Sequence, residues 1–178
     1  KKAEPKENIL TVKDLGIYNA IGKKVVKNIS FSVRAGEIVG IAGVEGNGQR
    51  QLIDAITGLH PYSEGSIKLM DTEVSSMNIK QLRKTGLVHV PEDRMTLGIA
   101  AEMPISEKMI ADKVDNKRYF SKLLTNKKAV KEDTDEWIDE YKVLCKNGDQ
   151  HVSGLSGGNI QKVVVAREYE TKPSVMVA

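Results

Sequence analysis

Residues 43–50 read Gly43-Val44-Glu45-Gly46-Asn47-Gly48-Gln49-Arg50. A short apolar run, EIVGIAG (37–43), precedes them, and the following stretch QRQLIDAITGL (49–59) has apolar residues at helical spacing. We therefore expect a buried strand, a glycine-rich loop and a helix, in this order. A loop of this kind turns its backbone N–H groups toward the helix N-terminus and forms a nest that binds anions.

The loop matches the phosphate-binding pattern G-x-x-x-x-G-K-[ST] at Gly43 and Gly48, but Gln49 replaces the lysine and Arg50 replaces the serine or threonine. In that pattern the lysine reaches the outer phosphates of a nucleotide and the hydroxyl ligates magnesium. Gln49 can donate hydrogen bonds but carries no charge, and Arg50 brings a positive charge to the metal position. The sequence predicts a loop that can bind the phosphates of a nucleotide but supports hydrolysis of the nucleotide poorly. A glycine turn that only packs a helix against a sheet is the alternative.

A second glycine motif reads Leu155-Ser156-Gly157-Gly158-Asn159-Ile160-Gln161-Lys162 and leads into VVVAREYE. Ser156 is a favourable N-cap residue, and the pattern after it is helical. The amides around Gly157 and Gly158 would lie at the positive end of the helix dipole, where an anion is stabilised. An ordinary glycine-rich helix start is the alternative, but it does not explain the order and separation of the two motifs.

With these motifs, the chain resembles the ATP-binding subunits of ABC transporters, whose signature sequence is LSGGQ. The form LSGGN-x-QK and the run VPEDR (90–94) are more narrowly similar to the second nucleotide-binding domain of bacterial importers for sugars or nucleosides. The resemblance covers nearly all of residues 9–178. It implies an α/β fold of the P-loop NTPase class, an ABC nucleotide-binding domain with an antiparallel β subdomain and a helical subdomain.

The resemblance also implies roles for individual residues. Glu92 would occupy the Q-loop position, which contacts magnesium and the attacking water, and is the catalytic residue that we expect; a solvated ion pair with Arg94 is the alternative. Tyr18 would stack on adenine, unless it is purely structural. The residues expected to bind ATP are Gly43, Glu45, Gly46, Asn47, Gly48, Gln49, Arg50, Ser156, Gly157, Gly158 and Tyr18. Mg²⁺ would bind weakly at this loop, and no residue is assigned as a metal ligand.

The sequence departs from the family pattern at further positions. Asn159 replaces the glutamine of LSGGQ, and Ile160 stands where the sugar-importer form usually has glutamine. The final residues 175–178 match the strand that precedes the Walker B acidic residues. We therefore expect a domain that is incomplete at its C-terminus, without the catalytic glutamate, D-loop and switch histidine, and inactive by itself.

Hydrophobic patterning around the motifs predicts the remaining organisation. ILTVKDLGI (9–17) and VVKNISFSV (25–33) alternate like half-buried strands of an antiparallel sheet, and 61–71 and 86–90 contain further short strands. Between about 100 and 150 the sequence is helical and charged. One helix face there carries Val130, Thr134, Trp137, Ile138 and Tyr141. The expected divisions are a linker or tail at 1–8, a core at about 9–95 and 155–178, and a helical subdomain at about 96–154.

The composition is typical of one soluble globular domain. The chain has 178 residues, 40% of them hydrophobic and 29% charged, with a net charge of +3 that is spread rather than blocked and gives no support for nucleic-acid binding. The single cysteine, Cys145, fits a reducing compartment. No apolar run approaches the ~18 residues of a membrane span. The resemblance implies a peripheral position on the cytoplasmic face of the cell membrane.

ABC domains pair head to tail, so the resemblance implies two partners, a second nucleotide-binding domain and the transmembrane permease subunits. We expect the loop of this chain to form a degenerate site, and its Ser156, Gly157 and Gly158 to complete the ATP site of the partner domain. The whole subunit would then be an ATP hydrolase coupled to import. The alternatives are a non-transport ABC ATPase and a regulatory nucleotide-binding module without coupled hydrolysis.

Overall fold

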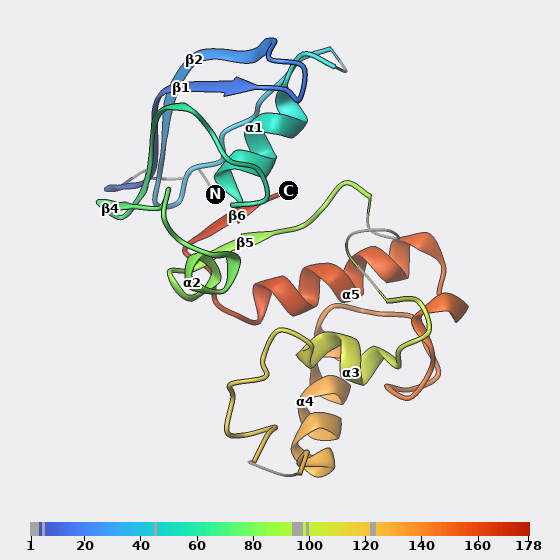
Figure 1. Ribbon diagram of the computed structural model, residues 1–178. Coiled ribbons are helices and arrows are strands. Elements are labelled where there is room, and N and C mark those ends of the chain that lie inside the picture. The colour runs from blue at the N-terminus through green and yellow to red at the C-terminus, as the bar shows by residue number, and fades with distance from the viewer. Residues whose placement is uncertain (1–3, 5, 45, 94–97, 99, 122–123) are drawn as a thin grey trace. The chain divides into compact units, whose positions relative to one another are not determined.

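A computed structural model describes residues 4, 6–44, 46–93, 98, 100–121 and 124–178 (Figure 1). The contacts between residues divide the chain into two compact units, one formed by residues 1–89 with 173–177 and the other by residues 90–172 with residue 178. The first unit contains the strands β1 to β6 and the helices α1 and α2. The second contains α3, α4, the short 3-10 helix η2 and α5.

The main sheet of the first unit is antiparallel, as the alternating sequence predicts. The order of its strands is β2-β1-β3-β4. The strands are β1 (Asn8–Tyr18), β2 (Lys24–Arg34), β3 (Glu64–Leu69) and β4 (Thr72–Glu73). The register between β1 and β3 shifts after Lys13, and Gly65 packs there against the carbonyl oxygens of Lys13 and Asp14. Gly65 has a φ of +84°, so this close approach requires glycine.

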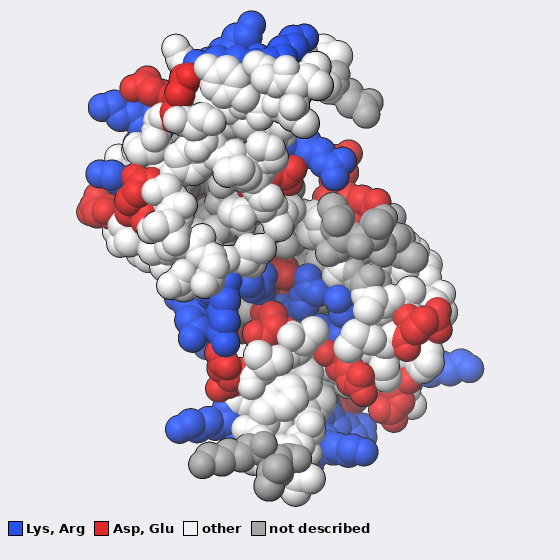
Figure 2. Space-filling view, viewed as in Figure 1, with Lys and Arg blue, Asp and Glu red and all other residues white. Residues whose placement is uncertain are grey.

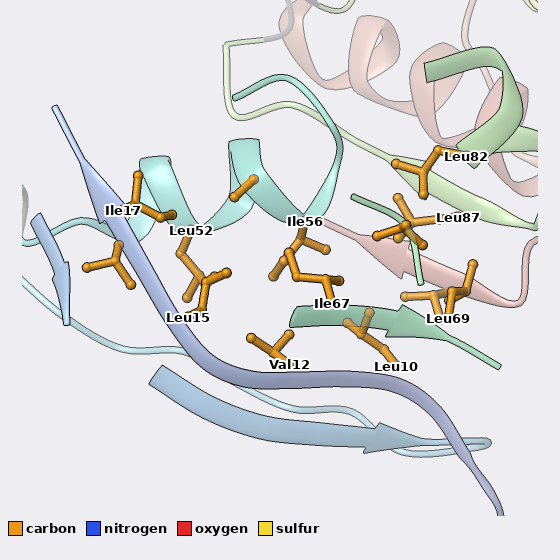
Figure 3. Packing of buried hydrophobic residues seen from close by; sticks show 14 residues of the cluster. Leu10, Val12, Leu15, Ile17, Leu52, Ile56, Ile67, Leu69, Leu82 and Leu87 are labelled. Carbon is orange, nitrogen blue, oxygen red and sulfur yellow. The ribbon is translucent and has the colours of Figure 1, made fainter. Parts of the chain in front are cut away.

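Helix α1 (Gln49–Ile56) covers one face of this sheet and forms the core with it (Figure 3). Because side chains alternate along a strand, β1 turns every second residue toward the helix, with one irregularity between Val12 and Leu15, and the residues at these positions are apolar. Leu52 and Ile56 of α1 are buried among these side chains. The fully buried residues of the cluster include Leu15, Ile17, Ile67, Leu69 and Val12.

The two short apolar runs near residues 86–90 and 175–177 form a parallel pair of strands. β5 (Leu87–His89) pairs with β6 (Val175–Val177). Helix α2 (Ile79–Lys84) precedes β5 and begins at a capping box. Leu87 and Val175 belong to the same hydrophobic cluster as β1 and α1, so the pair is part of the core of the first unit.

The apolar run EIVGIAG (37–43) forms no strand, and the prediction of a buried strand before the loop is wrong in this structure. Ile38 is 97% exposed and Ile41 is 46% exposed. Hydrophobicity alone does not make a strand, because each strand also needs a neighbour for its backbone hydrogen bonds. β1 is already paired on both edges, by β2 and β3, and no described strand pairs with this run.

The second unit is helical. Its elements are α3 (Ile105–Ile110), α4 (Lys127–Glu140), η2 (Val152–Gly154) and α5 (Gly157–Tyr169). The predicted apolar face of α4 is confirmed at Val130, Thr134 and Trp137, which are buried. On the face shown in Figure 2, basic and acidic side chains are interspersed over this unit. Among the described residues, no helix has both the length and the apolar character to cross a membrane.

A charged network holds the C-terminal part of α5 in this unit. Arg167 donates from Nη1 to the carbonyl oxygen of Gly98 at 3.0 Å, and its guanidinium lies 2.7 Å from the carboxylate of the buried Glu168. The Lys113 ammonium donates to the carbonyl oxygen of Arg167 at 3.2 Å and lies 5.2 Å from the ring centre of Trp137. Burial lowers the pKa of Lys113. These contacts join α5 to the segments that precede it in the chain.

Candidate functional site

The glycine-rich loop ends where α1 begins, and two of its glycines are required by the backbone. Gly48 is the N-cap of α1 with a φ of +95°, and a Cβ there would lie 2.7 Å from the carbonyl oxygen of Val25. Glycine thus lets the start of α1 pack tightly on β2. Gly46 has a φ of +85° and nothing within 4 Å of a Cβ position, so space is open beside it. Glu45, also expected in the site, lies outside the described residues.

Gln49 folds back over the start of the loop. A Cβ added to Gly43 would clash with the side-chain amide nitrogen of Gln49. The amide therefore lies inside the loop. Gln49 stands at the lysine position of the phosphate-binding pattern. It provides a neutral donor, and hydrogen bonds from charged donors are about twice as strong.

Arg50 points away from the loop. Its side chain is 76% exposed, and its Nε lies 3.9 Å from Asp54 Oδ2, one helical turn further on. The backbone N–H of Asn47 is used inside the loop, where it donates to the carbonyl oxygen of Val44 at 3.2 Å. The open space beside Gly46 fits a phosphate, but position 50 does not fit Mg²⁺, because it offers no oxygen ligand. No group of three or more metal-binding side chains occurs among the described residues.

Tyr18 lies at the end of β1, opposite Lys24 of β2. Its hydroxyl donates to Glu64 Oε1 at 2.7 Å, and the Lys24 ammonium lies 2.5 Å from the other oxygen of Glu64 and 5.7 Å from the Tyr18 ring centre. The hydrogen bonds from Lys24 and Tyr18 lower the pKa of Glu64. Since Gly48 packs on the residue after Lys24, this cluster lies near the loop. Adenine stacking on Tyr18 stays a prediction.

Glu92 lies in the second unit, in a bend shortly after β5, and is exposed. Its expected partner in the alternative ion pair, Arg94, lies outside the described residues. The Q-loop role of Glu92 therefore stays a prediction.

The signature motif lies at the start of α5. Ser156 occupies the N-cap position, as predicted, but its hydroxyl makes no capping hydrogen bond to the helix backbone. Ser156 Oγ accepts instead from Asn159 Nδ2 at 2.9 Å. Ser156, Gly157 and Gly158 are exposed, and a Cβ on Gly158 would meet nothing within 4 Å. The N-terminus of α5 is therefore open to a ligand.

The apolar side chains of α5 are buried and hold the helix in the second unit, while its N-terminus stays exposed. Ile160, Val163 and Val164 are almost completely buried, and Leu155 is buried just before the helix. The structure therefore places the described residues of the glycine-rich loop (43, 44 and 46–50) at the start of α1, and the signature residues at the start of α5. Sequence reasoning missed the contacts of Glu64 and Asn159, because neither contact is encoded in a motif.

The fold is that of an ATP-binding cassette. It is similar to the ADP conformation of MJ1267, an ATP-binding cassette of an ABC transporter, with a TM-score of 0.75 and 22% identity over 96% of this chain and 68% of that chain. It is also similar to the cassette MJ0796 in a dimeric post-hydrolysis state bound to ADP and Pi, with a TM-score of 0.76 and 17% identity over 94% of this chain and 72% of that chain. The predicted α/β P-loop NTPase fold is confirmed.

The chain belongs to the ABC transporter family, whose model matches residues 26–178. It is 33% identical over 178 residues to the guanosine import ATP-binding protein NupO of Bacillus subtilis (strain 168), covering 100% of this chain and 35% of the relative. It is 38% identical over 176 residues to the nucleoside import ATP-binding protein NupA of Lactococcus lactis subsp. cremoris (strain MG1363), covering 98% and 35%. The galactose/methyl galactoside import ATP-binding protein MglA of Vibrio vulnificus (strain CMCP6) is 33% identical over 177 residues, covering 99% and 34%.

The chain thus spans about a third of the length of these relatives. The predicted resemblance to sugar and nucleoside import ATP-binding proteins is confirmed.

Proposed function

We propose that this chain is the second, degenerate nucleotide-binding domain of an ABC subunit that powers the import of a nucleoside or sugar. The names of the relatives NupO, NupA and MglA support this class of solute. The subunit would be peripheral on the cytoplasmic face of the membrane, bound to permease subunits. A second nucleotide-binding domain would pair with this one head to tail.

The contrast between the two motifs carries the proposal. At the loop, Gln49 places a neutral amide where a lysine is needed, and Arg50 turns outward to Asp54. At the start of α5, Ser156 and Gly158 are exposed and the serine does not cap the helix. One anion site therefore lacks the lysine and the hydroxyl of the phosphate-binding pattern, while the start of α5 is exposed.

In the proposed pair the two motifs serve different ATP sites. The loop of this chain would bind ATP weakly through its backbone, with Tyr18 near the adenine and Glu92 in the Q-loop position. Ser156, Gly157 and Gly158 would hold the outer phosphate of the ATP bound to the partner domain. Backbone N–H groups and the dipole of α5 would stabilise negative charge there, which is the main protein contribution in phosphoryl transfer.

ATP turnover of the assembled transporter with a Ser156→Arg subunit tests this proposal. A long side chain at the start of α5 should block the phosphate and lower turnover by at least about tenfold, the scale of losing an essential transition-state contact. Ser153→Arg is the matched control, because Ser153 is exposed in the neighbouring η2 helix and should keep turnover near that of the wild type. Unchanged turnover in Ser156→Arg would contradict the proposal.

A regulatory module that binds nucleotide without coupled hydrolysis is the second candidate, favoured by the loss of both the lysine and the hydroxyl from the loop. Such a module would bind ATP at its own loop and leave turnover elsewhere to other domains. In that case Ser156→Arg would leave turnover unchanged, while loop variants would change only the response of transport to nucleotide concentration.

A further inference from the structure

The side chain of Asn159 bridges two groups on either side of the signature helix start. Its Oδ1 accepts from the backbone N–H of Leu144 at 2.9 Å, and its Nδ2 donates to Ser156 Oγ at 2.9 Å. A backbone N–H can only donate, so it fixes the oxygen of the amide toward Leu144. The NH₂ group must then face Ser156.

This orientation decides what the serine hydroxyl can do. A hydroxyl oxygen has one hydrogen to donate and two lone pairs to accept. One lone pair of Ser156 Oγ is occupied by the amide of Asn159, so the hydroxyl hydrogen cannot point at Asn159. Ser156 is exposed, so its hydrogen is free to point outward, toward the same space as the open N-terminus of α5.

The turn that holds the amide is itself fastened to α5. Lys162 Nζ donates to the carbonyl oxygen of Lys142 at 2.6 Å, and the Tyr141 hydroxyl donates to Glu170 Oε1 at 2.9 Å. Positions 159, 162 and 170 fall on one face of a helix with 3.6 residues per turn. The turn after α4 is thus attached along one face of α5, and the amide of Asn159 has little freedom to rotate.

We propose that Asn159 is a positioning residue that aims the Ser156 hydroxyl hydrogen at the phosphate of the nucleotide on the partner domain. This inference rests on the function proposed above. In this role Asn159 acts through Ser156 and needs no contact of its own with the nucleotide. It turns the serine into a hydrogen-bond donor, which is the only role in which a hydroxyl can bind a fully ionised phosphate oxygen.

A double-mutant cycle of Ser156→Ala and Asn159→Ala, measured as kcat and KM for ATP in the assembled transporter, tests this role. With Ser156 present, Asn159→Ala should lower kcat by about three- to tenfold, part of the value of a hydrogen bond to a charged group. With Ser156→Ala present, the same change should lower kcat less than about twofold, because its target is gone. Equal losses in both backgrounds, or no loss in either, would overturn the inference.

Asn159→Asp separates positioning from structural support. The carboxylate still accepts from the Leu144 N–H, so the turn stays attached, and the unfolding temperature should stay near that of the wild type. It cannot donate to Ser156, and the hydroxyl would turn inward to it. The kcat should fall with Ser156 present, and the fall should shrink in the Ser156→Ala background; an undiminished fall would mean that only the new charge acts, and would overturn the inference.

The two proposals fail differently. Unchanged turnover in both Ser156→Ala and Ser156→Arg would contradict the proposed function itself. Reduced turnover in the Ser156 variants together with additive Asn159 effects would leave the proposed function standing and refute only the positioning role.

Discussion

The side-chain amide nitrogen of Gln49 lies against Gly43, within the space that a Cβ of residue 43 would need. The two residues are the first and seventh of the glycine-rich loop, so the side chain at the end of the loop lies against the glycine at its start. This contact places a neutral donor at the start of α1. It also leads to two predictions that separate the binding role of the loop from its contribution to stability.

Gln49→Lys should strengthen ATP binding by the 178-residue protein. A charged donor adds about 1 kcal/mol over a neutral one, which corresponds to roughly a five- to tenfold lower Kd. Titration calorimetry with ATP measures this. Gln51→Lys is the matched control, since it adds the same charge to the same helix on a different side. Equal affinities for the two variants would show that position 49 does not face the nucleotide.

Gly43→Ala and Gly65→Ala should differ sharply in stability. The methyl group at 43 meets the end of a flexible side chain, which can move, so we expect a loss below about 1 kcal/mol in the free energy of unfolding. The methyl group at 65 meets backbone oxygens and forces a left-handed φ on alanine, which should cost about 1–3 kcal/mol or more. Urea unfolding compares them. Equal losses would mean that Gln49 is not free to leave the loop.

Asp133 should make the stability of the helical unit depend on acid pH. Arg118 Nε donates to Asp133 Oδ2 at 2.7 Å, the Tyr119 hydroxyl donates to the same oxygen, and these bonds lower the pKa of Asp133 from its ordinary value of 3.8. A lowered pKa adds stability that is complete above pH 3.8 and disappears as the pH falls through the folded-state value.

Asp133→Asn should therefore cost about 1–3 kcal/mol at pH 6 and progressively less below about pH 4. Urea unfolding at several pH values measures this. Asp135→Asn removes an exposed pair with Lys131 and should cost less than about 1 kcal/mol at any pH. A loss in Asp133→Asn that does not depend on pH would refute the ionic origin of the effect.

Much of the fold could be predicted because local patterns determine it. The alternation in residues 9–17 and 25–33 predicts β1 and β2, and the spacing of Val130, Thr134 and Trp137 predicts the buried face of α4. The prediction of a strand at 37–43 was wrong, because the apolar character of this run says nothing about which strand would pair with it. Pairing depends on residues distant in sequence.

In the candidate site, too, the features that depend on neighbouring residues could be predicted, and the contacts between distant residues could not. The replaced lysine and the exposed glycine helix start follow from residues next to one another in sequence. The ion pair of Lys24 with Glu64 joins residues 40 positions apart, and the bridge from Asn159 to Leu144 spans 15 positions. Contacts of this kind follow from the packing of whole elements and have no local pattern.

The turnover of the assembled transporter with Gly158→Asp in this domain tests the central claim most directly. Asp replaces a glycine in the first turn of α5, where open space surrounds the Cβ position and a negative charge favours the helix, so stability should stay or rise by about 0.5–1 kcal/mol. The same charge should repel the phosphate of the nucleotide on the partner domain. We predict at least about a tenfold loss of turnover, with turnover near that of the wild type in the control Ser153→Asp. Turnover of Gly158→Asp equal to that of the wild type would contradict the claim that the start of α5 serves an ATP site.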